Sequence, residues 1–208
     1  MNPMSIINPV YRRDNLAPFF VIDDVFTSEE LDAITTYCID SGTHKAQIMQ
    51  SRGAIVTDDK VRNSDIMMHQ VNQENRWLFE RVAGAFETAN RDAYNFELDG
   101  FNVMQYSEYN NKGAHYEYHM DVSFASINER FVIGRKLSLS VMLNEQSEFT
   151  GGQFQIVIDS QTLENPLTVP HKRGRFVFFP AFMMHRVAPV HTGTRRSLVF
   201  WALGPKFR

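Results

Sequence analysis

The first hundred residues contain two stretches whose apolar positions recur at the spacing of amphipathic helices. In residues 27–39, TSEELDAITTYCI, the apolar side chains share one helical face, and Thr27 followed by Glu30 forms a capping-box sequence at the start. Between residues 73 and 91 a second apolar set repeats at the same spacing. We expect both segments to be helices that bury their apolar faces, the second one against a sheet.

Beyond residue 99 the pattern changes to short runs with period-two alternation, separated by turn signals. The stretch KLSLSVMLN at 136–144 alternates most regularly, with leucines and valine on one face and serines and methionine on the other. An earlier apolar run at 17–26 also predicts a strand, whereas the polar residues 41–64 predict loop with a short strand at Ala54–Val56. The strands expected in the second half cover residues 100–107, 114–121, 136–144, 153–158, 166–170, 174–179, 184–190 and 195–203.

These elements predict a mainly β fold with N-terminal helices. Many short strands with helices gathered at one end favour a jelly roll or another double-sheet barrel, with the helices packed on its outside. The length of 208 residues suits one domain, 1–208. Within it, residues 1–99 would form a supporting region and residues 100–204 the strand-rich core.

Composition narrows the class of protein. The net charge of −3 and the pI of about 6.2 argue against broad nucleic-acid binding. Cys38 is the only cysteine, which excludes an intramolecular disulfide and is typical of a reducing compartment. The first residues lack the pattern of a secretory signal, and no apolar run approaches the roughly 18 residues of a membrane span. We therefore expect a cytoplasmic protein without membrane partners.

The stretch HYEYHMD at 115–121 raises the question of a metal site. In a strand, His119 and Asp121 point to the same side and could bind one ion, whereas His115 lies about 13 Å from His119 along an extended chain. Glu117 shares the parity of the pair, and it could lie near the mouth of a site or simply be exposed. Because a single His-x-Asp pair is common by chance, the interpretation depends on a third ligand.

A candidate third ligand, His185, lies in the apolar stretch 179–201, where a solitary histidine would otherwise be a core residue. Ten residues later, Arg195 and Ser197 share one face of another apolar strand, and Arg196 points to the opposite face. A barrel interior tolerates an arginine only where an anion meets it. Two histidines and one carboxylate form a facial triad that leaves three positions of an octahedral iron open, enough for a 2-oxo acid and dioxygen. The planar guanidinium of the arginine can then bind the distal carboxylate of 2-oxoglutarate.

Taken in order, these motifs resemble the Fe(II)/2-oxoglutarate-dependent dioxygenases, and more narrowly the prolyl 4-hydroxylase-like branch. The resemblance covers residues 100–204 and implies a double-stranded β-helix as the catalytic core. It also implies an iron bound by two histidines and an aspartate, with 2-oxoglutarate bound beside it. The residues that carry the match are His119-x-Asp121, LSLSVMLNEQSEFTGGQFQI, His185, and Arg195-x-Ser197 running into Trp201.

The resemblance further assigns roles within the pocket. Arg195 and Ser197 would bind the cosubstrate, and Tyr106 occupies a position where related hydroxylases often have a tyrosine that contacts it. Met142 replaces a second tyrosine that some relatives have. The implied reaction is hydroxylation of a substrate C–H bond with dioxygen and release of succinate and CO2, with ascorbate as a candidate reductant.

The branch favours a peptidyl residue as substrate, proline first. The polar loops 41–64 and 122–135 are candidates to flank an extended peptide. Hydroxylation of a free amino acid or another small molecule is the alternative within enzymes. A non-catalytic, cupin-like metal sensor or sugar-binding module is the alternative from another class, although such a module has no need of Arg195. The loop arginines that could contact a peptide are Arg52, Arg62, Arg130 and Arg135.

Overall fold

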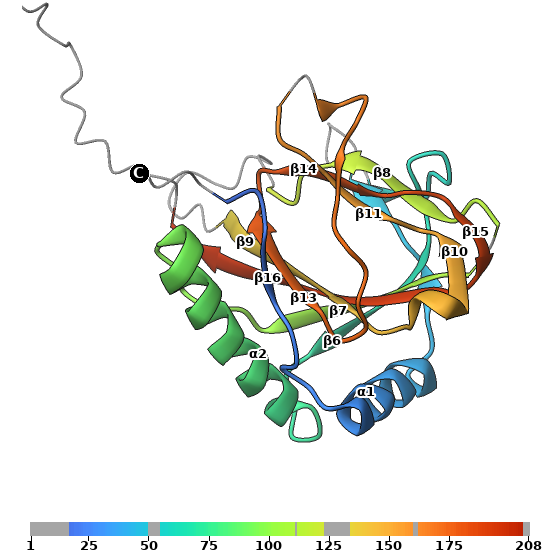
Figure 1. The fold of residues 1–208 in the computed structure, drawn as a ribbon. Helices are drawn as coiled ribbons and strands as arrows, with labels where there is room; N and C mark the ends of the chain where they lie inside the picture. The colour runs from blue at the N-terminus through green and yellow to red at the C-terminus, as the bar shows by residue number, and fades with distance from the viewer. Residues whose placement is uncertain (1–16, 50–54, 111, 123–133, 160–161, 206–208) are drawn as a thin grey trace, which may run out of the picture.

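Two facing β-sheets, with two helices on the outer side of one of them, form the body of the protein in the computed structural model (Figure 1). The structure describes residues 17–49, 55–110, 112–122, 134–159 and 162–205. The larger sheet has seven strands and the smaller one five, and all their pairings are antiparallel. The predicted mainly β fold with N-terminal helices is confirmed.

The larger sheet contains strands from both halves of the chain. In spatial order its strands are β1 (Phe20–Ile22), β13 (Phe176–Pro180), β9 (Gly134–Met142), β16 (Arg195–Gly204), β7 (Val103–Tyr109), β6 (Asp65–Gln70) and β2 (His44–Lys45). The smaller sheet has the order β12 (Leu167–Thr168), β11 (Phe154–Val157), β14 (Met184–Val187), β8 (His115–His119) and β5 (Arg62–Asn63). Two further ribbons pair β10 (Phe149–Gly151) with β15 (Val190–Gly193), and β3 (Ile48–Met49) with β4 (Ile55–Val56).

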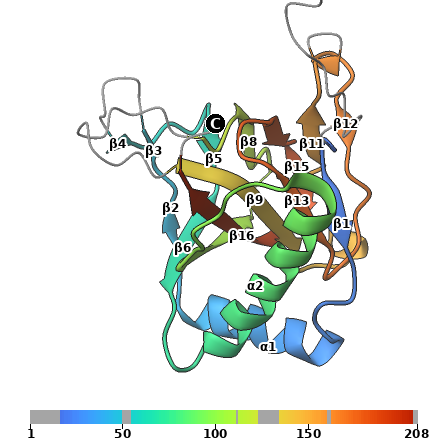
Figure 2. The ribbon, with the colours of Figure 1, turned by 90° about the vertical axis from the view of Figure 1, so that its left-hand side faces the viewer.

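The helices form where the apolar spacing predicts them. Helix α1 (Ser28–Asp40) begins with the expected capping box, in which the Glu30 amide donates to Thr27 Oγ1 and the Thr27 amide donates to Glu30 Oε2. Helix α2 (Arg76–Ala89) continues into a π-helical turn, η1 (Asn90–Tyr94). In Figure 2, α2 runs in front of the larger sheet beside β16 and β9, and α1 lies at the lower end of α2.

Alternation along the strands separates two hydrophobic clusters. The outer cluster packs the apolar faces of α1 and α2 against alternate residues of the larger sheet, such as Leu139, Phe178 and Phe200. The inner cluster lies between the two sheets and joins residues such as Met142 and Phe179 of the larger sheet to others of the smaller sheet, Ile156 among them. The helices therefore cover one side of the larger sheet and leave its other side to face the interior.

Two local differences from the sequence prediction follow from backbone chemistry. The predicted strand 184–190 is two strands, β14 and β15, and Pro189 lies between them, where it has no N–H to continue a ladder. In the segment predicted as mostly loop, β2 and β5 are strands because they pair with β6 and β8. Within the described ranges, no helix is long and apolar enough to cross a membrane.

Candidate active site

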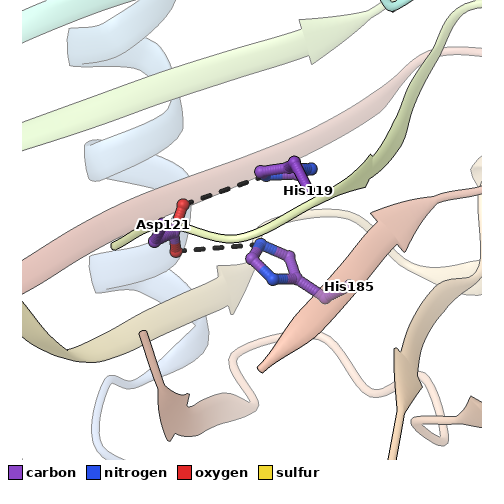
Figure 3. Close-up of side chains that lie close together, drawn as sticks. All are labelled: His119, Asp121 and His185. Atoms are coloured by element: carbon purple, nitrogen blue, oxygen red, sulfur yellow. Dashed lines mark ion pairs between the residues drawn. The ribbon is translucent and has the colours of Figure 1, made fainter. Parts of the chain in front are cut away.

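Three side chains converge at the end of the smaller sheet as the sequence predicts. His119 Nε2 lies 3.8 Å from Asp121 Oδ1, and His185 Nε2 lies 3.7 Å from Asp121 Oδ2 (Figure 3). One ligand atom from each of the three residues lies within 4.8 Å of the others. Two imidazoles and one carboxylate at this spacing can hold a single ion on one face, the donor set of non-haem Fe(II) oxygenases.

Backbone pairing brings the three residues together. His119 lies directly opposite His185 in the antiparallel pair of β8 and β14. Asp121 follows the end of β8, where its amide donates to the carbonyl of Ala181 at 2.9 Å. Segments that are far apart in the sequence are thus fixed in register by main-chain hydrogen bonds.

Neighbouring groups prepare these side chains for metal binding. The Nδ1–H of His119 donates to the Glu117 carbonyl at 2.8 Å, and that of His185 donates to the Met183 carbonyl at 2.9 Å. Both Nε2 lone pairs therefore remain available to an ion. Burial, together with the charge of His185, lowers the pKa of His119 to about 3, so this imidazole is neutral at neutral pH.

Asp121 is held in its ionised, metal-binding form. Burial alone would raise the pKa of this carboxyl, but His185, His119 and the Ser138 hydroxyl lower it below its usual value. Ser138 Oγ donates to Asp121 Oδ2 at 2.6 Å and leaves Oδ1 free of that bond. The serines that alternate with leucines in β9 thus include one that orients a metal ligand.

A β-bulge changes which residues of β8 face the site. His185 pairs with His119 and Val187 with Tyr116, so a step of two residues along β14 matches a step of three residues along β8. Tyr116 therefore turns inward and stacks on His119, with ring centroids 3.5 Å apart. Simple alternation placed Tyr116 on the opposite face from His119, which is wrong. The side chain of Glu117 is 46% exposed and lies beside His115, away from the metal ligands.

Arg195 is buried in the interior, on the face that its strand parity predicts. Only 1% of the residue is exposed, and its Nη1 donates to Ser197 Oγ at 3.1 Å while Nη2 contacts Met142 Sδ at 3.3 Å. Its Nε is buried without a partner, and no carboxylate of the described residues forms an ion pair with it. Burial lowers the pKa of this guanidinium. A fully buried arginine with unused donors indicates a site for an anion.

The Gly-Gly turn at 151–152 makes room for this arginine. Gly152 has a φ of +64°, and a Cβ at this position would lie 2.9 Å from Arg195 Cδ. Only glycine adopts this backbone conformation readily and allows so close an approach. The GGQF motif therefore shapes the wall of the anion pocket.

The neighbouring arginine has a different environment. Arg196 points to the other side of the sheet, where its Nε donates to Glu108 Oε1 at 2.9 Å. The prediction that Arg195 and not Arg196 faces the interior is therefore confirmed by the strand register.

Tyr106, predicted to contact the cosubstrate, lies on the other side of the sheet from Arg195. Tyr106 is fully buried in the outer cluster, and its hydroxyl donates to Glu108 Oε1 at 2.7 Å. Tyr109 takes its place near the pocket: it pairs with Arg195 across β7 and β16, and its ring centroid lies 5.3 Å from the guanidinium carbon. The sequence signal for Tyr109 was its shared parity with Gln105 and Ser107, two polar residues on the inward side of that strand.

Among the loop arginines, Arg62 and Arg135 lie near the metal ligands. Arg52 and Arg130 lie outside the residues that the structure describes.

Comparison with known proteins agrees with this geometry. Residues 104–203 match the family model described as "2OG-Fe(II) oxygenase superfamily". A PKHD-type hydroxylase of Janthinobacterium sp. (strain Marseille) is 33% identical over 90 residues, which cover 43% of this chain and 38% of that protein. The aligned region thus spans less than half of that relative.

Two solved structures share the fold. A prolyl-4-hydroxylase of Pseudomonas putida has a TM-score of 0.65 and 18% identity, covering 90% of this chain and 92% of that one. A prolyl hydroxylase from Trichoplax adhaerens, solved with a peptide fragment of the hypoxia inducible factor oxygen degradation domain, has a TM-score of 0.68 and 18% identity, covering 92% and 89%. The part of this chain that carries the site, residues 104–203, thus matches the 2OG-Fe(II) oxygenase superfamily in sequence, and the chain shares its fold with these prolyl hydroxylases.

Proposed function

We propose that the protein is an Fe(II)- and 2-oxoglutarate-dependent hydroxylase that acts on a peptidyl residue, with proline as the first candidate. The observation that carries the proposal is that one interior, between the two sheets, contains both the triad His119, Asp121 and His185 and a buried arginine, Arg195. No carboxylate of the described residues pairs with this arginine. A metal-binding module without a cosubstrate has no use for that arginine, so the non-catalytic, cupin-like alternative is not favoured. The names of the similar proteins, which are hydroxylases, support the same reaction class.

In this proposal, one set of residues binds the metal and another binds the cosubstrate. His119, Asp121 and His185 would hold iron, and Ser138 fixes the orientation of the carboxylate ligand. Arg195 and Ser197 would bind the distal carboxylate of 2-oxoglutarate, with Tyr109 beside them. When both are bound, iron and 2-oxoglutarate supply the oxidising power, by decarboxylation of the cosubstrate to succinate with dioxygen.

Burial of the pocket also contributes to function. Met142, Phe154 and Phe179 belong to the inner cluster: Met142 contacts Arg195, and the rings of Phe154 and Phe179 pack against His185. These apolar side chains exclude water, which strengthens the pairing of Arg195 with a carboxylate and protects reactive species from solvent.

The substrate class is tested by mass spectrometry on a panel of proline-containing peptides and free amino acids. The proposal expects a peptide to accelerate succinate formation and to gain one oxygen atom. Stimulation by free amino acids or other metabolites alone would overturn the peptidyl assignment and favour hydroxylation of a small molecule. Absence of 2-oxoglutarate binding in the iron-loaded protein would overturn the reaction class itself.

A further inference from the structure

A second cationic group lies in the interior, and the binding of 2-oxoglutarate does not explain it. Its first member is Arg62 on β5, which pairs with Tyr116 and shares its inward face. Arg62 is only 6% exposed. Its Nε donates to Ser64 Oγ at 3.0 Å, but its Nη2 is buried without a partner.

Arg62 is close to the metal ligands. Its guanidinium carbon lies 4.4 Å from the centroid of the Tyr116 ring, and that ring stacks on His119. A single aromatic ring therefore separates the cation from an iron ligand. The pKa of Tyr116 is raised by its burial, and the charges of Arg62 and Arg135 act on it in the opposite direction.

The second member is Arg135, at the start of β9. Its guanidinium carbon lies 3.7 Å from the centroid of the Trp201 ring. Trp201 pairs in register with Ser138, the residue that donates to Asp121, and the indole Nε1 of Trp201 is buried without a partner. Arg135 therefore approaches the metal ligands from the larger sheet, whereas Arg62 approaches them from the smaller one.

This group is separate from the pocket of Arg195. Trp201 lies six positions after Arg195 along β16, which corresponds to about 20 Å of extended strand. One molecule of 2-oxoglutarate bound at Arg195 does not extend to the far side of the metal ligands. The two cationic groups thus lie at opposite ends of the inner face.

No carboxylate of the described residues forms an ion pair with the buried Arg62 or with the half-buried Arg135, and Asp121 is the carboxylate whose charge acts on Arg135 from a distance. Outside the barrel, by contrast, arginines are paired with acids: Arg81 with Glu30, Arg175 with Asp23 and Arg196 with Glu108. Burying an arginine without a partner costs stability, and a folded protein tolerates it where a ligand supplies the missing charge. Among the described residues, the unused buried donors beside the metal ligands are Arg62 Nη2 and Trp201 Nε1.

We propose that Arg62, Arg135 and Trp201 bind a carboxylate of the substrate, and hence that the substrate is an acidic peptide. The carboxylate belongs to a residue adjacent to the hydroxylated one, because the cations flank the metal ligands. This inference rests on the proposed function, and it adds a charge requirement that the reaction class does not contain.

The first experiment uses the parent protein and needs no substitution. Blocked pentapeptides centred on proline carry glutamate or glutamine at the neighbouring positions, and their binding to the anaerobic protein loaded with Fe(II) and 2-oxoglutarate is measured by calorimetry. We expect the glutamate peptide to bind about 10- to 100-fold more tightly, the value of a charge-assisted pair in a desolvated site. The preference should weaken only slightly with added salt if the pair is buried.

The second experiment assigns the preference to the arginines. Arg62→Gln and Arg135→Gln should each reduce the preference for glutamate over glutamine to less than about threefold, because hydrogen-bonding capacity remains but the charge is lost. Affinity for 2-oxoglutarate should stay at the parent value. The matched control is Arg186→Gln: Arg186 lies on β14, stacks 4.5 Å from the Tyr118 ring and donates to Gln155 on the outer side of the same sheet. This control should keep the full preference.

The outcomes separate the inference from the proposed function. Equal binding of glutamate and glutamine peptides that are both hydroxylated overturns the acidic substrate and leaves the hydroxylase intact. A preference that survives in both arginine variants overturns the assignment to these residues. If only free dicarboxylic amino acids bind and turn over, the peptide source of the carboxylate is overturned.

Discussion

The two faces of the larger sheet are built from the same strands but serve different purposes. On β9 and β16, the residues that face the helices are apolar: Leu137, Leu139, Leu198 and Phe200 are all fully buried in the outer cluster. The residues that alternate with them face the interior and include serines, an arginine and a tryptophan, together with the apolar Met142 and Val199. Period-two alternation thus gives the same strands one face that packs against the helices and one face that carries polar and charged groups into the interior.

The difference shows how stability and function are distributed in this protein. The outer face contributes the apolar burial that holds the sheet to its helices. The inner face carries buried donors that lack acceptors at Arg195 and Trp201, Arg62 of the smaller sheet adds another, and such groups destabilise the unliganded protein. We infer that the outer face provides the free energy that allows the inner face to remain incompletely paired until ligands bind.

The largest expected effect comes from removing a metal ligand on the inner side. Asp121→Ala leaves two protein ligands where three converge, so iron binding should weaken sharply and turnover should stop while the fold persists. Metal analysis after gel filtration and succinate assays measure both. Glu117→Ala, on the outward side of the same strand, is the matched control and should behave like the parent. Turnover by Asp121→Ala at the parent rate would contradict the assignment of the triad.

A large substitution on the outer face should affect stability without affecting the chemistry directly. Phe178→Ala removes a fully buried ring that packs against Phe86, and it should lower the free energy of unfolding by about 3–5 kcal/mol. Ser107→Ala on the inner face removes one acceptor of Gln105 and should cost only about 1 kcal/mol. Urea titrations compare the two, and the reverse order would break the distinction between the faces.

Arg195→Leu should affect function and stability in opposite directions. The loss of a buried partner for the distal carboxylate costs about 2–5 kcal/mol, which is roughly a 30-fold to several-thousand-fold loss of 2-oxoglutarate affinity. Without ligand, the leucine variant should be at least as stable as the parent, because an unpaired buried charge is removed. Arg196→Leu is the control, and its 2-oxoglutarate affinity should remain near the parent value. Normal binding by Arg195→Leu together with loss in Arg196→Leu would contradict the strand register.

The smallest expected effect concerns Cys38, whose thiol should not be alkylated in the native protein. This thiol is fully buried in the outer cluster, and burial raises its pKa to about 12. At pH 8 the group is therefore protonated as well as inaccessible, and iodoacetamide should not label the native protein within hours. Mass spectrometry after unfolding in urea provides the labelled control. Rapid labelling of the native protein would show that the outer face opens readily.

Local sequence patterns predicted the features that depend on one strand at a time. The alternation in KLSLSVMLN assigned the two faces of β9, and parity placed Arg195 inside and Arg196 outside. The features that the sequence did not predict depend on how strands pair. The bulge that turns Tyr116 inward and Glu117 outward exists only in the pairing of β8 with β14. The position of Tyr109 beside the guanidinium of Arg195 likewise depends on the register of β7 with β16.

The same reasoning explains the unpredicted strands. The segments β2 and β5 are polar pairs of residues with little strand propensity of their own, and they form because β6 and β8 present free edges beside them. Long-range pairing of this kind overrides local preference. Arg62 therefore appeared in the sequence as a loop residue, and its position next to Tyr116 emerged only from the sheet.

The central claim is that the interior between the two sheets binds iron and 2-oxoglutarate together, and one anaerobic titration tests it most directly. The parent protein is loaded with Fe(II) in the absence of oxygen, and 2-oxoglutarate is added while the visible spectrum is recorded. We predict a weak charge-transfer band that saturates with one equivalent of 2-oxoglutarate and that requires far more in Arg195→Leu. Full iron loading with no such band at any concentration would contradict the account.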